Sequence, residues 1–168
     1  DIDYDKLLSL INAKFPPIPF LFCYGSAAFP QTGYNYTTEK PMIDLIFVVE
    51  NYCEWHQQNF EKNRNHYSGL GYVLGPQFLS FFERNLVPVH YNPFVKFEGF
   101  EIKYGVVSLN EVLSNLNTWG NLVVAGRMHK PIRILKNNSV LYSEKIQQAI
   151  QTNYVNALTL SFLLNYEQ

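Results

Sequence analysis

The fold is decided by two apolar stretches, PFLFCYGS at residues 19–26 and PMIDLIFVV at residues 41–49. Each run is short, apolar and flanked by proline or glycine, which is typical of a buried strand. The first strand ends at Gly25-Ser26. A glycine there lets the backbone approach a ligand, and a serine offers its hydroxyl and backbone N–H groups to an anion. The turn is therefore a candidate phosphate cradle, although strand–Gly–Ser turns are also common as purely structural features.

Asp44 is the charged residue inside the second stretch. Three of the four aspartates lie in the first five residues, so Asp44 is the one aspartate in the body of the chain. A buried carboxylate must be hydrogen-bonded, paired or bound to a metal, because burying it alone is very costly. A core aspartate that caps a loop is one interpretation. Beside a phosphate cradle a metal ligand is the preferred one, because Mg²⁺ takes one or two carboxylates together with substrate phosphates.

Composition excludes several classes of protein. The 168 residues are 47% hydrophobic and 16% charged, which indicates a globular domain with a core. The 13 Lys and Arg and 14 Asp and Glu residues give a net charge of −1. We therefore expect no general basic surface for nucleic acid. Two cysteines make no disulfide framework, which favours a reducing compartment, and no apolar run reaches the ~18 residues of a membrane span.

The order of predicted elements indicates a mixed α/β (α+β) fold. An α/β unit over 1–108 is expected, followed by a smaller, mostly helical unit over 109–168. The predicted elements are a helix ending before Pro16, strands over 19–24 and 42–49, a helix over 52–64, a helix from Pro76, a hairpin of 87–97 and 100–107 turning at Glu98-Gly99, a helix capped by Ser108 with Glu111, a strand over 131–135 and a helix from Ser143 to Tyr166.

Three basic residues are candidates for binding an anion. Lys103 lies inside a predicted strand, so its stem is expected to be half-buried and its amine directed at an anion such as a triphosphate. A surface ion pair is the alternative. Arg127 and Lys130, with Arg133 nearby, form the densest positive cluster in a nearly neutral chain. A bidentate arginine suits phosphate well, although an ordinary basic turn would have the same composition.

His66 and Glu101 complete the set of candidates. His66 lies in a polar loop, where it would contact a phosphate or a base, or cap the preceding helix. Glu101 stands two residues before Lys103 and so faces the same side of its strand. It is a candidate metal ligand, and a solvated glutamate at a strand edge is the alternative.

A strand, a Gly-Ser turn and a second strand with an aspartate resemble the signature of the nucleotidyltransferase superfamily. Further motifs, in order along residues 20–135, make the chain similar to the Tam41/MMP37 family. They are Tyr24-Gly-Ser26 with Phe29 and Gln31, Lys40-Pro41 with Ile43-Asp44, Trp55-His56, His66-Tyr67-Ser68, Lys103-Tyr-Gly-Val-Val-Ser108, Ala125-Gly-Arg127 and Lys130-Pro131.

The resemblance implies a phosphatidate cytidylyltransferase that is peripheral to the matrix side of the mitochondrial inner membrane. Such an enzyme converts CTP and phosphatidic acid to CDP-diacylglycerol and pyrophosphate with Mg²⁺, for cardiolipin synthesis. Also implied are a nucleotidyltransferase-like mixed sheet over 1–108 and a winged-helix-like domain over 109–168. The site residues that we expect are Asp44, Lys103 and Glu101 as catalytic residues, Asp44 and Glu101 as metal ligands, and Tyr24, Gly25, Ser26, His66, Arg127 and Lys130 for nucleotide binding.

Two positions depart from the family pattern. Ala27 stands where the turn usually has a second glycine, and Ile46 stands where many nucleotidyltransferases carry a second acid. The missing acid is the reason why Glu101 is considered as the second metal ligand, and the number of metal ions stays open.

The charge of the acceptor favours direct transfer. A phosphate monoester has a second pKa near ~6, so it attacks as a dianion without a strong general base. We therefore expect the lipid phosphate to attack the α-phosphorus of CTP with no covalent enzyme intermediate. Two other functions stay open: nucleotidyl transfer to another acceptor, and a non-catalytic import or scaffold factor on a degenerate fold, which Ile46 favours.

Overall fold

The computed structural model describes residues 2–25, 28–29, 42–67, 69–85, 89–138 and 140–166. Ser26 and the loop predicted over 30–41 lie outside the described residues. In chain order the elements are α1 (Tyr4–Lys14), β1 (Phe20–Tyr24), β2 (Ile43–Val49), α2 (Tyr52–Lys62), the 3₁₀ turn η2 (Arg64–His66), α3 (Gly69–Asn85), β3 (His90–Phe97), β4 (Phe100–Ser108), α4 (Leu109–Thr118), α5 (Ala125–Met128), β5 (Ile132–Asn137) and α6 (Val140–Tyr166).

The strands form one mixed sheet in the order β3-β4-β2-β1-β5. β2 and β4 run parallel, and the other neighbours are antiparallel. The mixed α/β class that the sequence predicts is therefore confirmed. The register places Asp44 of β2 opposite Tyr24 of β1 on one side and Lys103 of β4 on the other.

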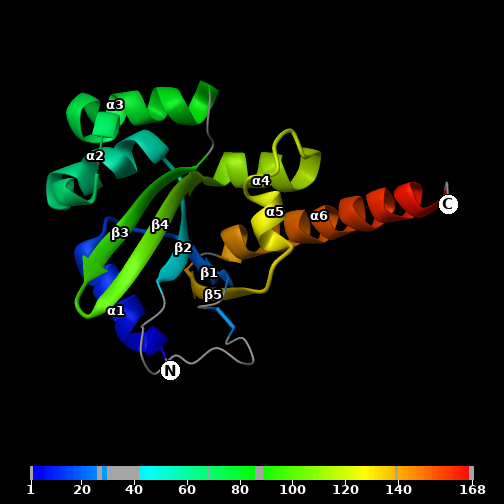
Figure 1. The fold of residues 1–168 in the computed structure, drawn as a ribbon, viewed down its shortest axis with the longest axis horizontal. Helices are drawn as coiled ribbons and strands as arrows, with labels where there is room; N and C mark the ends of the chain where they lie inside the picture. Colours follow the sequence, from blue (N-terminus) through cyan, green and yellow to red (C-terminus); the bar gives the residue numbers. More distant parts are fainter. Residues whose placement is uncertain are drawn as a thin grey trace.

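Helices cover both faces of the sheet (Figure 1). Alternate residues of β2 supply the two cores: Leu45 and Phe47 pack on one face, and Ile46 and Val48 on the other. The first face is covered by α1 and α2, and the second by α4, α5 and α6. Asp44 has the same parity as Ile46, so it lies on the face under α4, α5 and α6.

Local signals set most helix and turn positions. The Ser108 hydroxyl accepts from the backbone N–H of Glu111 at 3.3 Å, which confirms the predicted cap of α4. Glu98 and Gly99 have φ of 48° and 90°, so the β3–β4 hairpin turns at the predicted pair. Gly75, at φ 74° and ψ −172°, breaks α3 just before Pro76. The helix predicted from Pro76 is therefore the second half of a longer element.

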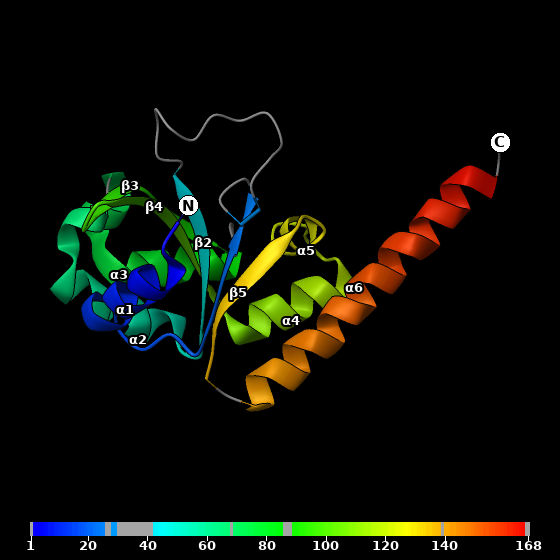
Figure 2. The ribbon, with the colours of Figure 1, turned by 90° about the horizontal axis from the view of Figure 1, so that it is seen from below.

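The second predicted unit contributes a strand to the sheet of the first. β5 pairs antiparallel with β1, so residues 132–137 belong to the sheet. α6 begins at Val140, three residues before the predicted Ser143, and extends away from the body (Figure 2). The boundary at 108/109 and the winged-helix-like character stay predictions. No helix in the described part of the chain is long and apolar enough to cross a membrane.

Candidate functional site

The site lies where β1 ends and β2 begins. Tyr24, Asp44 and Lys103 are neighbours across three strands and face the same side of the sheet. Gly25 follows Tyr24 with φ 77°, a conformation that favours glycine. A Cβ on Gly25 would stand 3.7 Å from Asp44 Oδ2, so the turn backbone lies directly against the carboxylate.

Asp44 holds a half-buried carboxylate with an unsatisfied oxygen. The side chain is 28% exposed, and its Oδ1 is buried without a hydrogen-bond partner among the described residues. Lys103 Nζ lies 3.9 Å from Oδ1, which is an ion-pair distance but not a hydrogen bond. Burial raises the pKa of Asp44, while the charges of Lys103, Arg127 and Lys130 oppose that rise.

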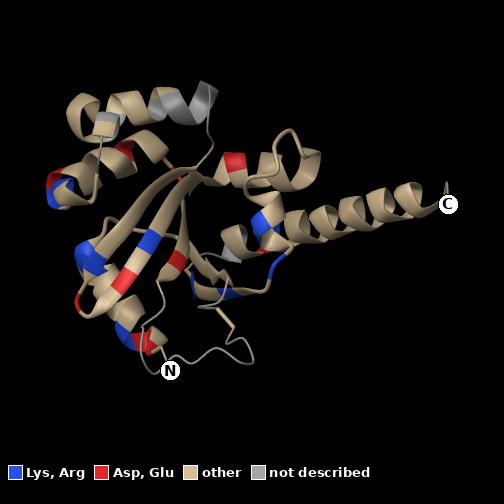
Figure 3. Ribbon diagram, in the orientation of Figure 1, with Lys and Arg blue, Asp and Glu red and all other residues tan. Residues whose placement is uncertain are grey.

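Lys103 therefore pairs with this carboxylate, and Arg127 and Lys130, also singled out by the sequence, act on it electrostatically. Figure 3 shows acidic and basic positions on the neighbouring strands β2 and β4 and a basic position on α5. Arg127, on α5, donates from a guanidinium nitrogen to the carbonyl of Val123, while its Nε is buried without a described partner. Lys130 is exposed just after α5. The exposed Lys130 thus offers donors to an anionic ligand.

Tyr91 is a site residue that the sequence did not reveal. Its ring lies under two of the cations, with Lys103 Nζ 5.0 Å and the Arg127 guanidinium carbon 5.1 Å from the ring centroid. Arg127 also lies 5.7 Å from the centre of the Tyr24 ring. Gly105, in the middle of a strand, was the available signal, because such a glycine often marks a close approach. It is paired with Tyr91 in the β3–β4 register.

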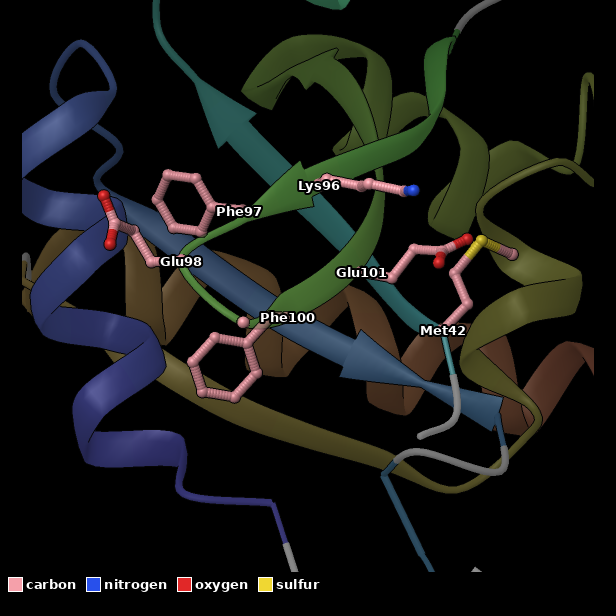
Figure 4. Close-up of a pocket in the computed structure, with 7 residues that line it drawn as sticks. Met42, Lys96, Phe97, Glu98, Phe100 and Glu101 are labelled. Atoms are coloured by element: carbon pink, nitrogen blue, oxygen red, sulfur yellow. The ribbon is translucent and has the colours of Figure 1, made fainter. Parts of the chain in front are cut away.

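Glu101 lies on the same face as Lys103, two residues nearer the β3–β4 hairpin. It pairs across the hairpin with Lys96, and the next residue of β4, Ile102, pairs with the first residue of β2, Ile43. Figure 4 shows it beside Met42 at a hollow of about 690 Å³ that also includes the hairpin turn. The charges that shift the pKa of Asp44 are cations and do not include Glu101. A metal role for Glu101 stays a prediction.

The residues present fit a magnesium ion that is completed by substrate phosphates. The described residues hold no group of three or more His, Cys, Asp or Glu side chains that would bind a metal. Asp44 supplies one carboxylate with an unsatisfied oxygen. Mg²⁺ typically uses one or two carboxylates plus phosphate oxygens and waters. Asp44 is therefore the residue that would hold it.

His66 is not brought to this cluster. Its Nδ1 lies 3.1 Å from the Tyr104 hydroxyl, and its ring packs 5.6 Å from the ring of Phe15. Both partners belong to the core under α1 and α2, on the opposite face from Asp44. Strand alternation explains the separation, because Lys103 and Tyr104 are adjacent in sequence and point to opposite faces. The half-buried His66 thus packs beside that core, and its expected nucleotide contact stays a prediction.

Burial of three imidazoles predicts a loss of stability in acid. Burial lowers the pKa of His56, His66 and His90, that of His66 to about 4. Below an unfolded value near ~6.5, the unfolded chain binds protons that the folded chain does not, so the free energy of unfolding falls as the pH falls. We expect the urea midpoint to drop between pH 7 and pH 5.

Burial raises the pKa of Asp44, which stabilises the folded state as the pH falls and so opposes the effect of the histidines. His66→Gln leaves Asp44 unchanged, so its comparison with the wild type isolates the contribution of one imidazole. That variant should show a smaller drop in the urea midpoint, and His129→Gln, which changes an exposed histidine, should match the wild type. The same drop in all three proteins would contradict the assignment of His66.

The fold and the site define an α/β domain with one carboxylate among three cations, a site suited to a polyphosphate with a bound metal. The family model Tam41_Mmp37, described as "Phosphatidate cytidylyltransferase, mitochondrial", matches residues 7–168. The chain therefore belongs to this family, as the sequence motifs predicted.

Curated relatives carry the same description. A mouse protein described as mitochondrial phosphatidate cytidylyltransferase is 37% identical over 159 residues, covering 94% of this chain and 46% of its own length. Proteins of that description from Saccharomyces cerevisiae and human are 38% and 34% identical, over 96% and 97% of this chain and 40% and 35% of their own length. The chain thus spans less than half the length of these relatives.

A solved structure described as "Crystal structure of the toxin-antitoxin with AMP-PNP" matches with a TM-score of 0.42 and 9% identity, over 99% of this chain and 100% of that chain. A likeness at this level carries no argument about the site.

Proposed function

We propose that this chain carries the nucleotidyl-transfer centre of a phosphatidate cytidylyltransferase. The reaction moves CMP from CTP to phosphatidic acid and gives CDP-diacylglycerol and pyrophosphate. Family membership and the relatives' descriptions support the activity. The observation that carries it is the Asp44 carboxylate, which has an unsatisfied oxygen and lies among Lys103, Arg127 and Lys130.

The transfer brings two anions together. A phosphate oxygen of phosphatidic acid forms a bond to the α-phosphorus of CTP, and the bond from that phosphorus to the oxygen bridging to the β-phosphate breaks. Pyrophosphate leaves with the electron pair of that bond. Because the attacking phosphate is largely dianionic, the residues need to neutralise and align the groups rather than remove a proton.

The residues of the site have separate tasks in this proposal. Lys103 and Arg127 neutralise the triphosphate, and Lys130, exposed at the rim, meets the departing pyrophosphate. Gly25 has no side chain and lies against Asp44, so it leaves room for a phosphate that reaches Asp44 through the metal. Asp44 holds Mg²⁺, which when bound would add positive charge beside the reacting phosphate. Ser26, outside the described residues, remains the proposed hydroxyl of the cradle.

The cellular setting is part of the same proposal. The relatives are described as mitochondrial. The proposed place is the matrix side of the inner membrane, with peripheral contact where the lipid is found and CDP-diacylglycerol entering cardiolipin synthesis. The net charge of −1 argues against a polynucleotide as the acceptor.

The test uses the full natural polypeptide with vesicles containing phosphatidic acid, Mg²⁺ and CTP labelled at the α-phosphate. The label should enter the organic phase as CDP-diacylglycerol, whereas label at the γ-phosphate should stay in water as pyrophosphate. Vesicles with diacylglycerol in place of phosphatidic acid are the control and should give no product. Label found in RNA or in a water-soluble molecule would show that phosphatidic acid is not the acceptor. Label on the protein would show a covalent intermediate in place of direct attack. No transfer at all would favour the scaffold function.

A further inference from the structure

The ring of Tyr91 lies close to two cations of the site, Lys103 and Arg127. Lys103 comes from β4 and Arg127 from α5, so no common backbone element holds the two charges at a fixed separation. Both lie about 5 Å from the centre of the Tyr91 ring, at 5.0 Å and 5.1 Å. The negative face of an aromatic ring attracts cations at such distances. The ring therefore acts together with the Asp44 carboxylate to offset the repulsion between the two like charges when no ligand is bound.

Gly105 creates the space in which this ring lies. A Cβ at Gly105 would come within 2.6 Å of Tyr91 Cε1 and within 2.7 Å of a methyl carbon of Val89, closer than real Cβ contacts. Gly105 and Tyr91 are direct partners in the β3–β4 register, so the ring lies across the strand rather than standing off it. The placement of Tyr91 is thus built into the sheet.

The tyrosine remains neutral in this position. Burial raises the pKa of Tyr91, with further contributions in the same direction from Tyr24 and Asp44, while Arg127 opposes them. The hydroxyl oxygen is itself buried. Tyr91 therefore contributes a neutral aromatic surface and has no exposed donor for a ligand, which separates its role from that of the cations.

We propose that Tyr91 is a positioning residue for phosphate binding, holding Lys103 and Arg127 on its ring so that both charges face one polyanion. The ligand class is a chain of linked phosphates, of which the triphosphate of CTP in the proposed function is the instance. The inference rests on the proposed function only for that nucleotide. The part of Tyr91 that we expect to act is the aromatic ring, because ring–cation attraction needs no hydroxyl.

The experiment compares Tyr91→Phe with Tyr91→Leu by titration calorimetry in the presence of a chelator. The probes are inorganic tripolyphosphate and CTP. We expect Tyr91→Phe to bind both probes within about twofold of the wild type, and Tyr91→Leu to bind both about tenfold more weakly. In assays of transfer, the loss in Tyr91→Leu should appear chiefly in the KM for CTP. Binding by Tyr91→Phe shows that the ring acts without its hydroxyl, and a separate control tests whether loss of packing explains the effect of Tyr91→Leu.

The matched control is Phe97→Leu, which removes a buried aromatic ring from the same strand on the opposite face. It should lose thermal stability without losing tripolyphosphate affinity. The proposal is overturned if Tyr91→Leu binds tripolyphosphate as the wild type does, if Phe97→Leu weakens it equally, or if the wild type binds none. Wild-type binding of tripolyphosphate but not of CTP would instead overturn the proposed nucleotide and leave the role of Tyr91 to be decided by the variants.

Discussion

Asp44→Asn is expected to lower the rate of CMP transfer by at least about a hundredfold. A carboxylate that holds a metal beside the reacting phosphate contributes several kcal/mol, and each ~1.4 kcal/mol is a factor of ten. Asparagine keeps the shape of the side chain, and it removes the charge on an oxygen that is buried without a described hydrogen-bond partner. The fold should therefore survive, and the loss should appear in turnover measured with labelled CTP and phosphatidic acid vesicles.

Two further variants serve as a control for this result and as a test of the second metal ligand. Glu98→Gln removes the same charge from an exposed hairpin residue that pairs with Lys14 at 3.7 Å, and it should leave turnover unchanged. Glu101→Gln tests the proposed second ligand and should lower turnover if that carboxylate contacts the metal. An Asp44→Asn protein with turnover within about threefold of the wild type would rule out Asp44 as the metal-holding residue.

Asn59→Ala is expected to lower the free energy of unfolding by about 2–4 kcal/mol. Asn59 is fully buried, and its amide nitrogen donates to the Tyr67 hydroxyl at 2.9 Å and to the Tyr104 hydroxyl at 3.0 Å. Its amide oxygen accepts from Asn63 at 2.8 Å. Alanine leaves these groups without that partner and opens a cavity, and both effects destabilise the core.

Urea unfolding measures this loss, with Asn65→Ala as the control. Asn65 is exposed in η2, so the same substitution there should change the free energy of unfolding by less than about 0.5 kcal/mol. Equal values for the two variants would show that the hydrogen bonds of Asn59 do not support the core.

The central part of the site was predictable because it depends on local patterns. An aspartate inside an apolar run, a glycine at a strand end and a lysine inside a strand each point to the site by residue type and position alone. The structure brings Asp44, Gly25 and Lys103 together through the register of β1, β2 and β4. The approach of Arg127 and Lys130 to Asp44 depends instead on the packing of α5 over the sheet.

The positions of His66 and Tyr91 depend on which face of the sheet each element covers. His66 has no strand alternation of its own to follow, and η2 packs on the α1 and α2 side. The side that Tyr91 faces is set by pairing with Gly105, and a shift of one residue in register would reverse it. The β5–β1 pairing joins residues more than 100 positions apart, such as Cys23 and Arg133. No local pattern in the sequence predicts that contact.

Calorimetric titration of CTP into the wild type and Asp44→Asn, each with and without Mg²⁺, tests most directly whether the cluster is a metal–triphosphate site. The wild type should bind CTP more tightly with Mg²⁺. Asp44→Asn should lose that gain and bind metal-free CTP at least as well as the wild type, because Lys103, Arg127 and Lys130 remain while a negative charge is gone. CTP affinity that is the same in all four titrations would contradict the assignment of the site.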